Sequence, residues 1–226
     1  MASTPTKRRK ISPSTAVPVT NENTQARPTS KDPDGVLQQR QDLLLCSAQQ
    51  ILRAKLQATV NIPTQTIETL QIKGMSPWAD RELGGWMRAL PMDSNLSVIG
   101  TAFGKYYEMA RTRAQCFLDA ERGLKTLIAD PKTLEHTGDA RLSNYFGNQD
   151  ISFSREHVTL DIAWLASFGD DGDVESHVTA RAKFPDTWRR TAGADLDRIG
   201  DAFDLLAKER GVLEAIRVVC KLIFSP

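Results

Sequence analysis

The sequence predicts a mainly α-helical protein, in which an irregular helical domain over residues 34–226, built around one long central helix, follows a disordered basic arm over residues 1–33. Three observations lead to this prediction. Apolar residues recur at spacings of three and four over most of the chain after residue 34. The longest such run extends from Ile99 to Ile128, and the first 33 residues contain few large apolar side chains. A chain of 226 residues has the size of one domain with a tail.

The arm consists mainly of Thr, Ser, Pro, Asn and Gln, and its large apolar residues are only Met1, Ile11, Val17 and Val19. Such a segment buries too little surface to offset its chain entropy, so we expect it to be disordered. Residues 1–40 carry seven basic and three acidic side chains, a net charge of +4, and the remaining 186 carry 22 and 25, a net charge of −3. The chain is therefore a basic arm on a mildly acidic body, which argues against a uniformly basic coat for a polyanion.

The first predicted helix covers residues 36–59. Asp34 can cap it, and it ends before Pro63. One face of this helix would carry Leu37, Leu44, Ala48, Ile51 and Leu52. The β-branched residues of the next segment, 64–73, leave helix and strand both open.

A short helix over residues 77–90 begins at Pro77, because proline is favoured in a first turn. Its buried side would consist of Trp78, Leu83, Trp86 and Leu90. The long central helix begins near Ser97 and ends at Asp130, before Pro131, which makes it roughly 45 Å long. Residues 131–156 are expected to form loops with short helical pieces.

Residues 158–184 fit two structures. Val158, Leu160, Ile162 and Trp164 alternate with polar residues, as do the residues before Phe184, so a small β-hairpin that turns near Gly169–Gly172 is one reading. The same residues fit two helices, 155–168 and 174–184, and we favour the helices. After them we expect a helix that carries Leu196 to Leu206 and is closed by Gly211, and a buried terminal helix over 212–224.

Sequence motifs predict no catalytic residues, no cofactor and no metal site. The glycines of Gly100-Thr-Ala-Phe-Gly104-Lys105 have the wrong spacing for a phosphate-binding loop. His136, His157 and His177 are isolated, which argues against two metal ligands on one face. The cysteines are Cys46, Cys116 and Cys220, and this odd number of distant residues predicts buried thiols in a reducing compartment. An enzyme whose catalytic residues assemble from distant positions remains the second alternative.

Four consecutive cations, Lys7, Arg8, Arg9 and Lys10, lie in the arm. An extended basic tetrad can lie in an acidic groove, and this one resembles a monopartite nuclear import signal, which receptors of the importin-α family bind. A second interpretation is contact with nucleic-acid phosphates. A third is a solvated basic patch without a partner.

A second basic group surrounds an aromatic residue in the body. Arg181, Lys183, Trp188, Arg189 and Arg190 are candidate contacts for single-stranded nucleic acid, since phosphates bind guanidinium groups and bases stack on the indole ring. The alternative, which we favour, packs Trp188 in the core with its basic neighbours pointing outward. In a similar group on the long helix, Lys105, Tyr106, Tyr107, Arg111 and Arg113, we expect the tyrosines to be mainly core residues.

These observations predict a non-enzymatic helical binding or assembly protein, nuclear or nucleo-cytoplasmic. Its expected partners are an importin-like receptor, an unidentified protein or a further copy of the chain, and single-stranded RNA, with no membrane. The alternative is a viral coat or nucleocapsid protein that packages single-stranded RNA in a virion. A disordered arm on a helical body is similar to the general plan of filamentous plant-virus coat proteins, although no motif aligns.

Overall fold

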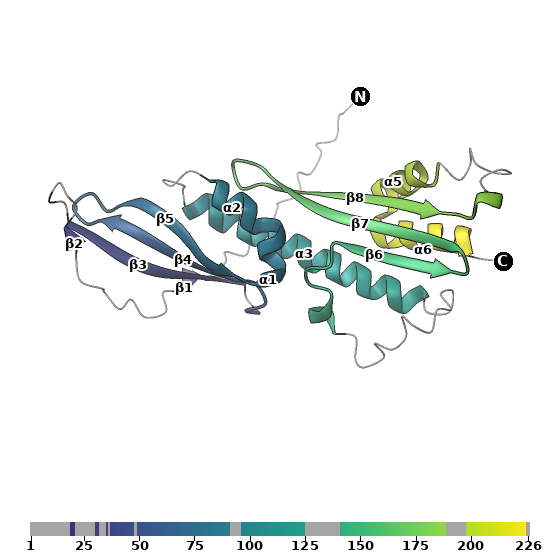
Figure 1. Ribbon diagram of the computed structural model, residues 1–226, viewed down its shortest axis with the longest axis horizontal. Helices are drawn as coiled ribbons and strands as arrows, with labels where there is room; N and C mark the ends of the chain where they lie inside the picture. Colours follow the sequence, from purple (N-terminus) through teal and green to yellow (C-terminus); the bar gives the residue numbers. More distant parts are fainter. Residues whose placement is uncertain are drawn as a thin grey trace, which may run out of the picture.

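The computed structural model describes residues 19–20, 30–31, 35, 37–47, 49–90, 96–124, 141–188 and 198–224. The described residues form two antiparallel sheets at opposite ends of the molecule, and a long helix begins near the middle and runs along the second sheet (Figure 1). The chain is therefore mixed α and β, and the prediction of a mainly α-helical protein is wrong. We call the sheet formed by strands between Val19 and Met75 the N-terminal sheet, and the sheet formed by strands between Asp150 and Lys183 the C-terminal sheet.

Three long strands make up most of the N-terminal sheet: β3 (Leu37–Cys46), β4 (Arg53–Asn61) and β5 (Thr66–Met75), paired in the order β3-β4-β5. The predicted helix over 36–59 does not exist, because the alternation from Leu52 to Val60 places every second residue on the same face of β4. The residues of the predicted helical face lie on both sides of the turn between β3 and β4. In that turn Gln50 has a φ of 55°, a left-handed backbone conformation that interrupts an α-helix. Tertiary pairing has overridden the helix propensity of these Gln- and Leu-containing segments.

Two pieces of the arm pair with β3. The strand β1 (Val19–Thr20) lies antiparallel to one end of β3, opposite Leu45 and Leu44, and β2 (Ser30–Lys31) lies antiparallel to the other end. At these four residues the arm is an edge strand of the N-terminal sheet. The rest of the predicted arm lies outside the described residues.

The predicted short helix at 77–90 is confirmed as three consecutive pieces: α1 (Pro77–Ala79), a π-helical turn η1 (Asp80–Gly84) and α2 (Gly85–Ala89). The predicted central helix is confirmed over α3 (Leu96–Leu124), and its predicted last residues, 125–130, lie outside the described residues. Leu83 and Met87 pack against the first half of α3 and against the end of the N-terminal sheet that contains Leu45 and Leu56. We call this end the base of the sheet, and the whole cluster the N-terminal core.

The C-terminal sheet consists of β6 (Asp150–Arg155), β7 (Val158–Phe168) and β8 (Val174–Lys183), paired in that order, after a short 3₁₀ turn η3 (Leu142–Asn144). The favoured helices over 155–168 and 174–184 are wrong, and the alternative hairpin is confirmed. Its turn needs Gly172, which has a φ of 82° and lies so close to the Val98 carbonyl that a Cβ would be 2.5 Å from that oxygen.

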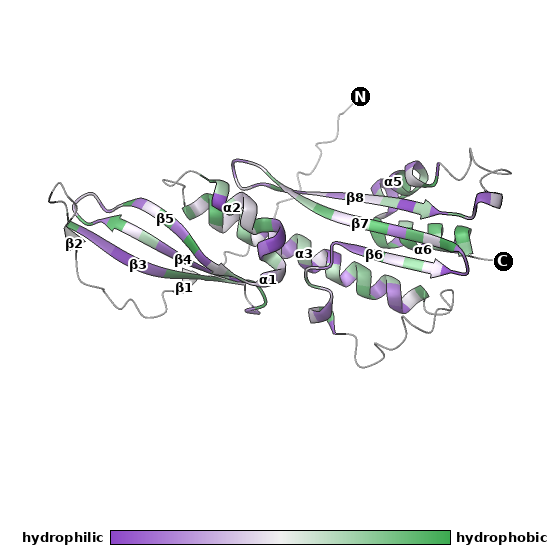
Figure 2. Ribbon diagram, in the orientation of Figure 1, coloured by the Kyte–Doolittle hydropathy of each residue, from purple (hydrophilic) through white to green (hydrophobic). Residues whose placement is uncertain are grey.

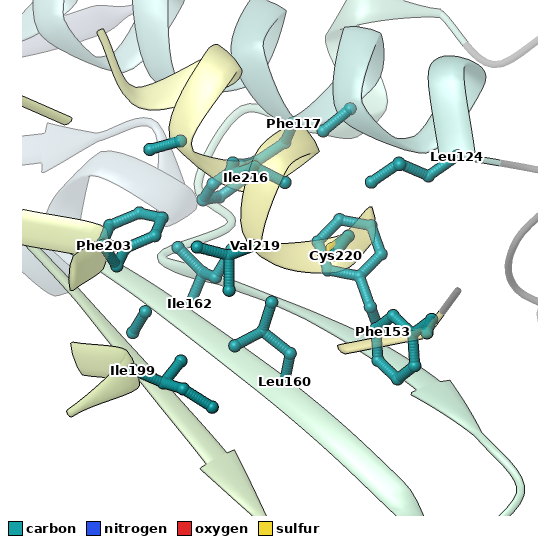
Figure 3. Packing of buried hydrophobic residues seen from close by; sticks show 14 of the residues in the cluster. Phe117, Leu124, Phe153, Leu160, Ile162, Ile199, Phe203, Ile216, Val219 and Cys220 are labelled. Atoms are coloured by element: carbon teal, nitrogen blue, oxygen red, sulfur yellow. The ribbon is translucent and has the colours of Figure 1, made fainter. Parts of the chain in front are cut away.

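The two predicted C-terminal helices are confirmed as α5 (Ile199–Arg210) and α6 (Val212–Phe224), joined by Gly211. Both helices and the second half of α3 cover one face of the C-terminal sheet (Figure 3). In this C-terminal core, Phe203 of α5 and Val219 of α6 face Leu160 and Ile162 of β7. Hydrophobic residues occupy most of α6 (Figure 2), and five of its residues are buried, but Leu222 is 73% exposed, so the predicted burial of the terminal helix is confirmed for one face only.

A buried ion pair lies where the two cores meet on α3. Arg113 of α3 donates two hydrogen bonds to Glu82 of η1, Nη1 to Oε2 at 3.0 Å and Nη2 to Oε1 at 2.6 Å. Its Nη1 also donates to the carbonyl oxygen of Trp164 on β7 at 2.8 Å. The two side chains are only 0% and 3% exposed, so this guanidinium connects three elements in a region that water does not reach.

Candidate nucleic-acid interface

The two cations of the predicted basic group that lie on β8 share one face of this strand. Ala180 and Ala182 point toward the C-terminal core, so the alternating Arg181 and Lys183 point to the opposite face of the sheet, where both are exposed. Within the described residues β8 is an edge strand, since the sheet order is β6-β7-β8. The two cations therefore lie at the border of a solvent-facing polar surface.

The aromatic part of the site lies just beyond the end of β8. Phe184 packs against the C-terminal core, and Trp188 stacks on it, with ring centroids 6.1 Å apart and an interplanar angle of 24°. Trp188 remains 48% exposed. The favoured prediction of a Trp188 packed in the core is therefore wrong. The ring is held in place by Phe184 and offers almost half of its surface to solvent.

Lys183 has an acidic partner across the strand pair. Its Nζ lies 2.8 Å from Oδ2 of Asp161 on β7, and Ser152 of β6 donates a hydrogen bond of 2.7 Å to Oδ1 of the same carboxylate. The hydrogen bond from Lys183, and then that from Ser152, lowers the pKa of Asp161. Asp161 also pairs in register with Arg181. Sequence analysis missed Asp161, because its place between the two cations follows only from the strand register.

The other predicted contact residues lie elsewhere. Arg189, Arg190 and the tetrad Lys7, Arg8, Arg9 and Lys10 lie outside the described residues. On α3, Tyr106 and Tyr107 are buried, as predicted, and Arg113 is sealed in its ion pair with Glu82. Burial, with the nearby Glu82 carboxylate, raises the pKa of Tyr106, so this phenol stays protonated. Of the cations in this group, Arg113 is buried, whereas Lys105 and Arg111 are exposed.

One grouping on the solvent-facing side of the C-terminal sheet contains the side chains of a hydrolase triad. Ser167 Oγ lies 2.9 Å from Nε2 of His177, and Oε2 of Glu175 lies 3.9 Å from that same nitrogen. A triad needs the acid on one ring nitrogen and the nucleophile on the other. The His177 and Glu175 side chains are also 59% and 78% exposed. This geometry does not activate a serine, and the grouping is a polar surface contact.

The buried thiols do not form a reactive site. Burial raises the pKa of both Cys116 and Cys220 to about 12, so neither is a thiolate at neutral pH. Among the residues that the structure describes, no three His, Cys, Asp or Glu side chains form a group able to hold a metal ion. The same residues include no helix that is long and apolar enough to cross a membrane. Comparison with protein-family models gave no match, and comparison with curated proteins gave none either.

Proposed function

We propose that the protein is a non-enzymatic binding and assembly protein that engages single-stranded nucleic acid at the end of β8 and enters the nucleus through its basic arm. The observation that carries the nucleic-acid part is the half-exposed Trp188, backed by Phe184, at the end of a strand with two exposed cations. A ring held by a second aromatic residue loses little freedom when a base stacks on it, and stacking tolerates any base sequence.

The charges around the site predict binding of moderate strength. Phosphates would meet Arg181 and Lys183, but Lys183 already interacts with Asp161 at 2.8 Å. A phosphate must compete with that carboxylate, so part of the electrostatic gain is lost. Because Lys183 is 72% exposed, its ion pair is screened by water and is weak enough to be exchanged.

The proposal is tested by titrating the full chain against a labelled uridylate oligomer at several salt concentrations. Arg181→Ala/Lys183→Ala should lower the slope of log affinity against log salt by about 1.4, which is about 0.7 for each lost phosphate contact. The control is Lys55→Ala/Lys73→Ala, which removes two exposed cations from the N-terminal sheet and should leave the slope unchanged. If both double variants lower the slope equally, binding is diffuse and the site is not at β8.

Trp188→Ala tests the stacking part separately. Loss of one stacked base should weaken binding by about 1–3 kcal/mol, roughly 5- to 150-fold, with little change of the salt slope. Trp188→Phe keeps an aromatic ring and should retain most of the affinity. An alanine variant that binds like the wild type would exclude stacking at this position.

The import part of the proposal depends on the arm. Replacing Lys7, Arg8, Arg9 and Lys10 with alanine should abolish nuclear accumulation of a fusion that is too large to diffuse through nuclear pores. The matched control replaces Lys55, Lys73, Lys208 and Lys221, which are exposed cations of the body. Accumulation that survives loss of the tetrad would contradict import through the arm.

RNA packaging remains the alternative, although the resemblance to helical coat proteins no longer applies to a mixed α/β body. Purification separates the two functions. A packaging protein should copurify with nucleic acid, seen as a raised ratio of absorbance at 260 and 280 nm, and form particles in the electron microscope. The binding protein proposed here should elute as a small species that takes up nucleic acid only when it is added.

A further inference from the structure

Within the described residues, the arm pairs with β3 at the two ends of that strand. Thr20 lies opposite Leu44 and Ser30 opposite Gln38, so five β3 residues, 39–43, separate the two pairings. The arm spans the same interval with nine residues, 21–29. An unbroken antiparallel partner would use five residues there. The two described pairings therefore have different registers along β3.

The sequence of β3 is complementary to itself. If β3 pairs antiparallel with β3 of a second copy around a two-fold axis at Gln41, Arg40 lies opposite Asp42 of the second copy, and Asp42 lies opposite Arg40 of that copy. Both side chains are exposed, and both point to the same face, because they are two residues apart on one strand. Directly opposed charges of unlike sign stabilise a strand pair, whereas like charges destabilise it.

The same register places Leu37 opposite Leu45 of the second copy, at the ends of β3 where the arm now pairs. The arm and a second copy would thus need the same backbone groups. The opposite edge of the sheet is β5, and α2 contacts that strand, so the helices do not lie along the β3 side (Figure 1). When the arm is released, β3 becomes the edge strand, and its backbone N–H and C=O groups can then pair with another extended chain.

We propose that the β3 edge is a self-association site for a second copy of this chain, and that the arm straps its two ends and competes with that second copy. The pair formed is isologous, with Gln41 at the axis and two Arg40–Asp42 contacts related by symmetry. Release of the arm increases dimerisation. This site lies in the N-terminal sheet and does not depend on nucleic-acid binding at β8.

The strap is tested in the full chain with paired substitutions in β1 and β2. Thr20→Pro/Ser30→Pro places prolines in both attachments and disfavours strand pairing there, whereas Thr20→Val/Ser30→Val favours it. Sedimentation equilibrium should give a dimer dissociation constant about tenfold or more lower for the proline variant than for the valine variant. Equal dissociation constants, or a proline variant that stays monomeric at all concentrations, would contradict competition between the arm and a second copy for β3.

The contact itself is tested by charge reversal in the proline variant. Arg40→Asp alone and Asp42→Arg alone each place like charges opposite one another and should give monomers. Arg40→Asp/Asp42→Arg restores unlike charges and should restore the dimer. An equimolar mixture of the two single variants should form a mixed dimer, since each then meets its opposite. A dimer that is indifferent to these reversals lies elsewhere on the surface, and the β3 register is wrong.

Discussion

The two sheets share α3 but are stabilised differently. Helices α3, α5 and α6 cover the inner face of the C-terminal sheet, where Leu160 and Ile162 are 0% exposed. Among the described residues, the helices pack against the N-terminal sheet at the end nearest to α3, where Leu56 is 1% exposed. Toward its far end, Leu37 is 41% and Ile62 37% exposed. The C-terminal sheet therefore packs against helices along its length. The N-terminal sheet packs against helices at one end and is more exposed at the other.

This difference shows how one chain separates stability from accessibility. Burial of apolar surface stabilises the C-terminal sheet and the base of the N-terminal sheet. The outer part of the N-terminal sheet, where Leu37 and Ile62 are exposed, depends more on strand pairing. Figure 2 shows this gradient along β3, which is hydrophilic over its outer part and hydrophobic where it reaches the helices.

The largest expected effect comes from the ion pair between the cores. Arg113→Met leaves the Glu82 carboxylate buried without its cation, and the free energy of unfolding in urea should fall by about 3–5 kcal/mol. Glu82→Leu/Arg113→Met removes both charges and should recover most of the loss. We also expect the single variant to unfold in two steps, because Arg113 joins η1 to β7. A single variant as stable as the wild type would show that the pair does not connect the cores.

Matched leucine substitutions compare the sheets directly. Leu160→Ala should lower the free energy of unfolding by about 2–5 kcal/mol, and Leu56→Ala by a similar amount, since both side chains are fully buried. Leu37→Ala, at the far end of β3, should cost less than about 1 kcal/mol. The measurement is the urea midpoint at constant m-value. Equal losses at Leu37 and Leu160 would mean that the far end of the N-terminal sheet is covered in solution.

Thiol labelling should distinguish the regions without any substitution. Cys46 is half-buried at the base of β3, whereas Cys116 and Cys220 are buried in the C-terminal core with pKa values of about 12. At pH 8 iodoacetamide should modify Cys46 about 100-fold or more faster than the other two, since the thiolate is the reactive form. Mass spectrometry of digested samples measures each site. Comparable rates at all three would mean that the C-terminal core opens as readily as the base of the N-terminal sheet.

The smallest expected effect concerns Asp161. Lys183 and Ser152 lower the pKa of this carboxyl group in the folded protein, so its contribution to stability is present above the unfolded pKa of about 3.9 and is lost as the pH falls through the folded value. Asp161→Asn should reduce the acid-induced loss in the free energy of unfolding by a few tenths of a kcal/mol. The effect is small because Lys183 is mostly exposed. Asp42→Asn is the control from the N-terminal sheet. An acid profile that is unchanged by Asp161→Asn would contradict the assigned pKa direction.

Sequence reasoning was accurate where the chain has one strong local pattern. The helices α3, α5 and α6 and the short helical segment near Trp86 follow from apolar spacing, with Pro77 and Gly211 as boundaries. It was wrong over 36–59 and 155–184, where short apolar runs fit both periods. For the site, sequence reasoning grouped Trp188 with Arg181 and Lys183, but the position of Asp161 between the cations required the β7–β8 register.

The sequence by itself determined the long central helix, the two terminal helices and the burial of Tyr106 and Tyr107, because residues three and four apart share a helix face without any help from distant residues. Only the tertiary structure decided that Leu37–Cys46 and Arg53–Asn61 are strands. It also decided that Arg113 is buried against Glu82, and that Trp188 is exposed rather than packed in the core. Strand pairing and the burial of a charge depend on partners far away in the chain, and no local pattern specifies them.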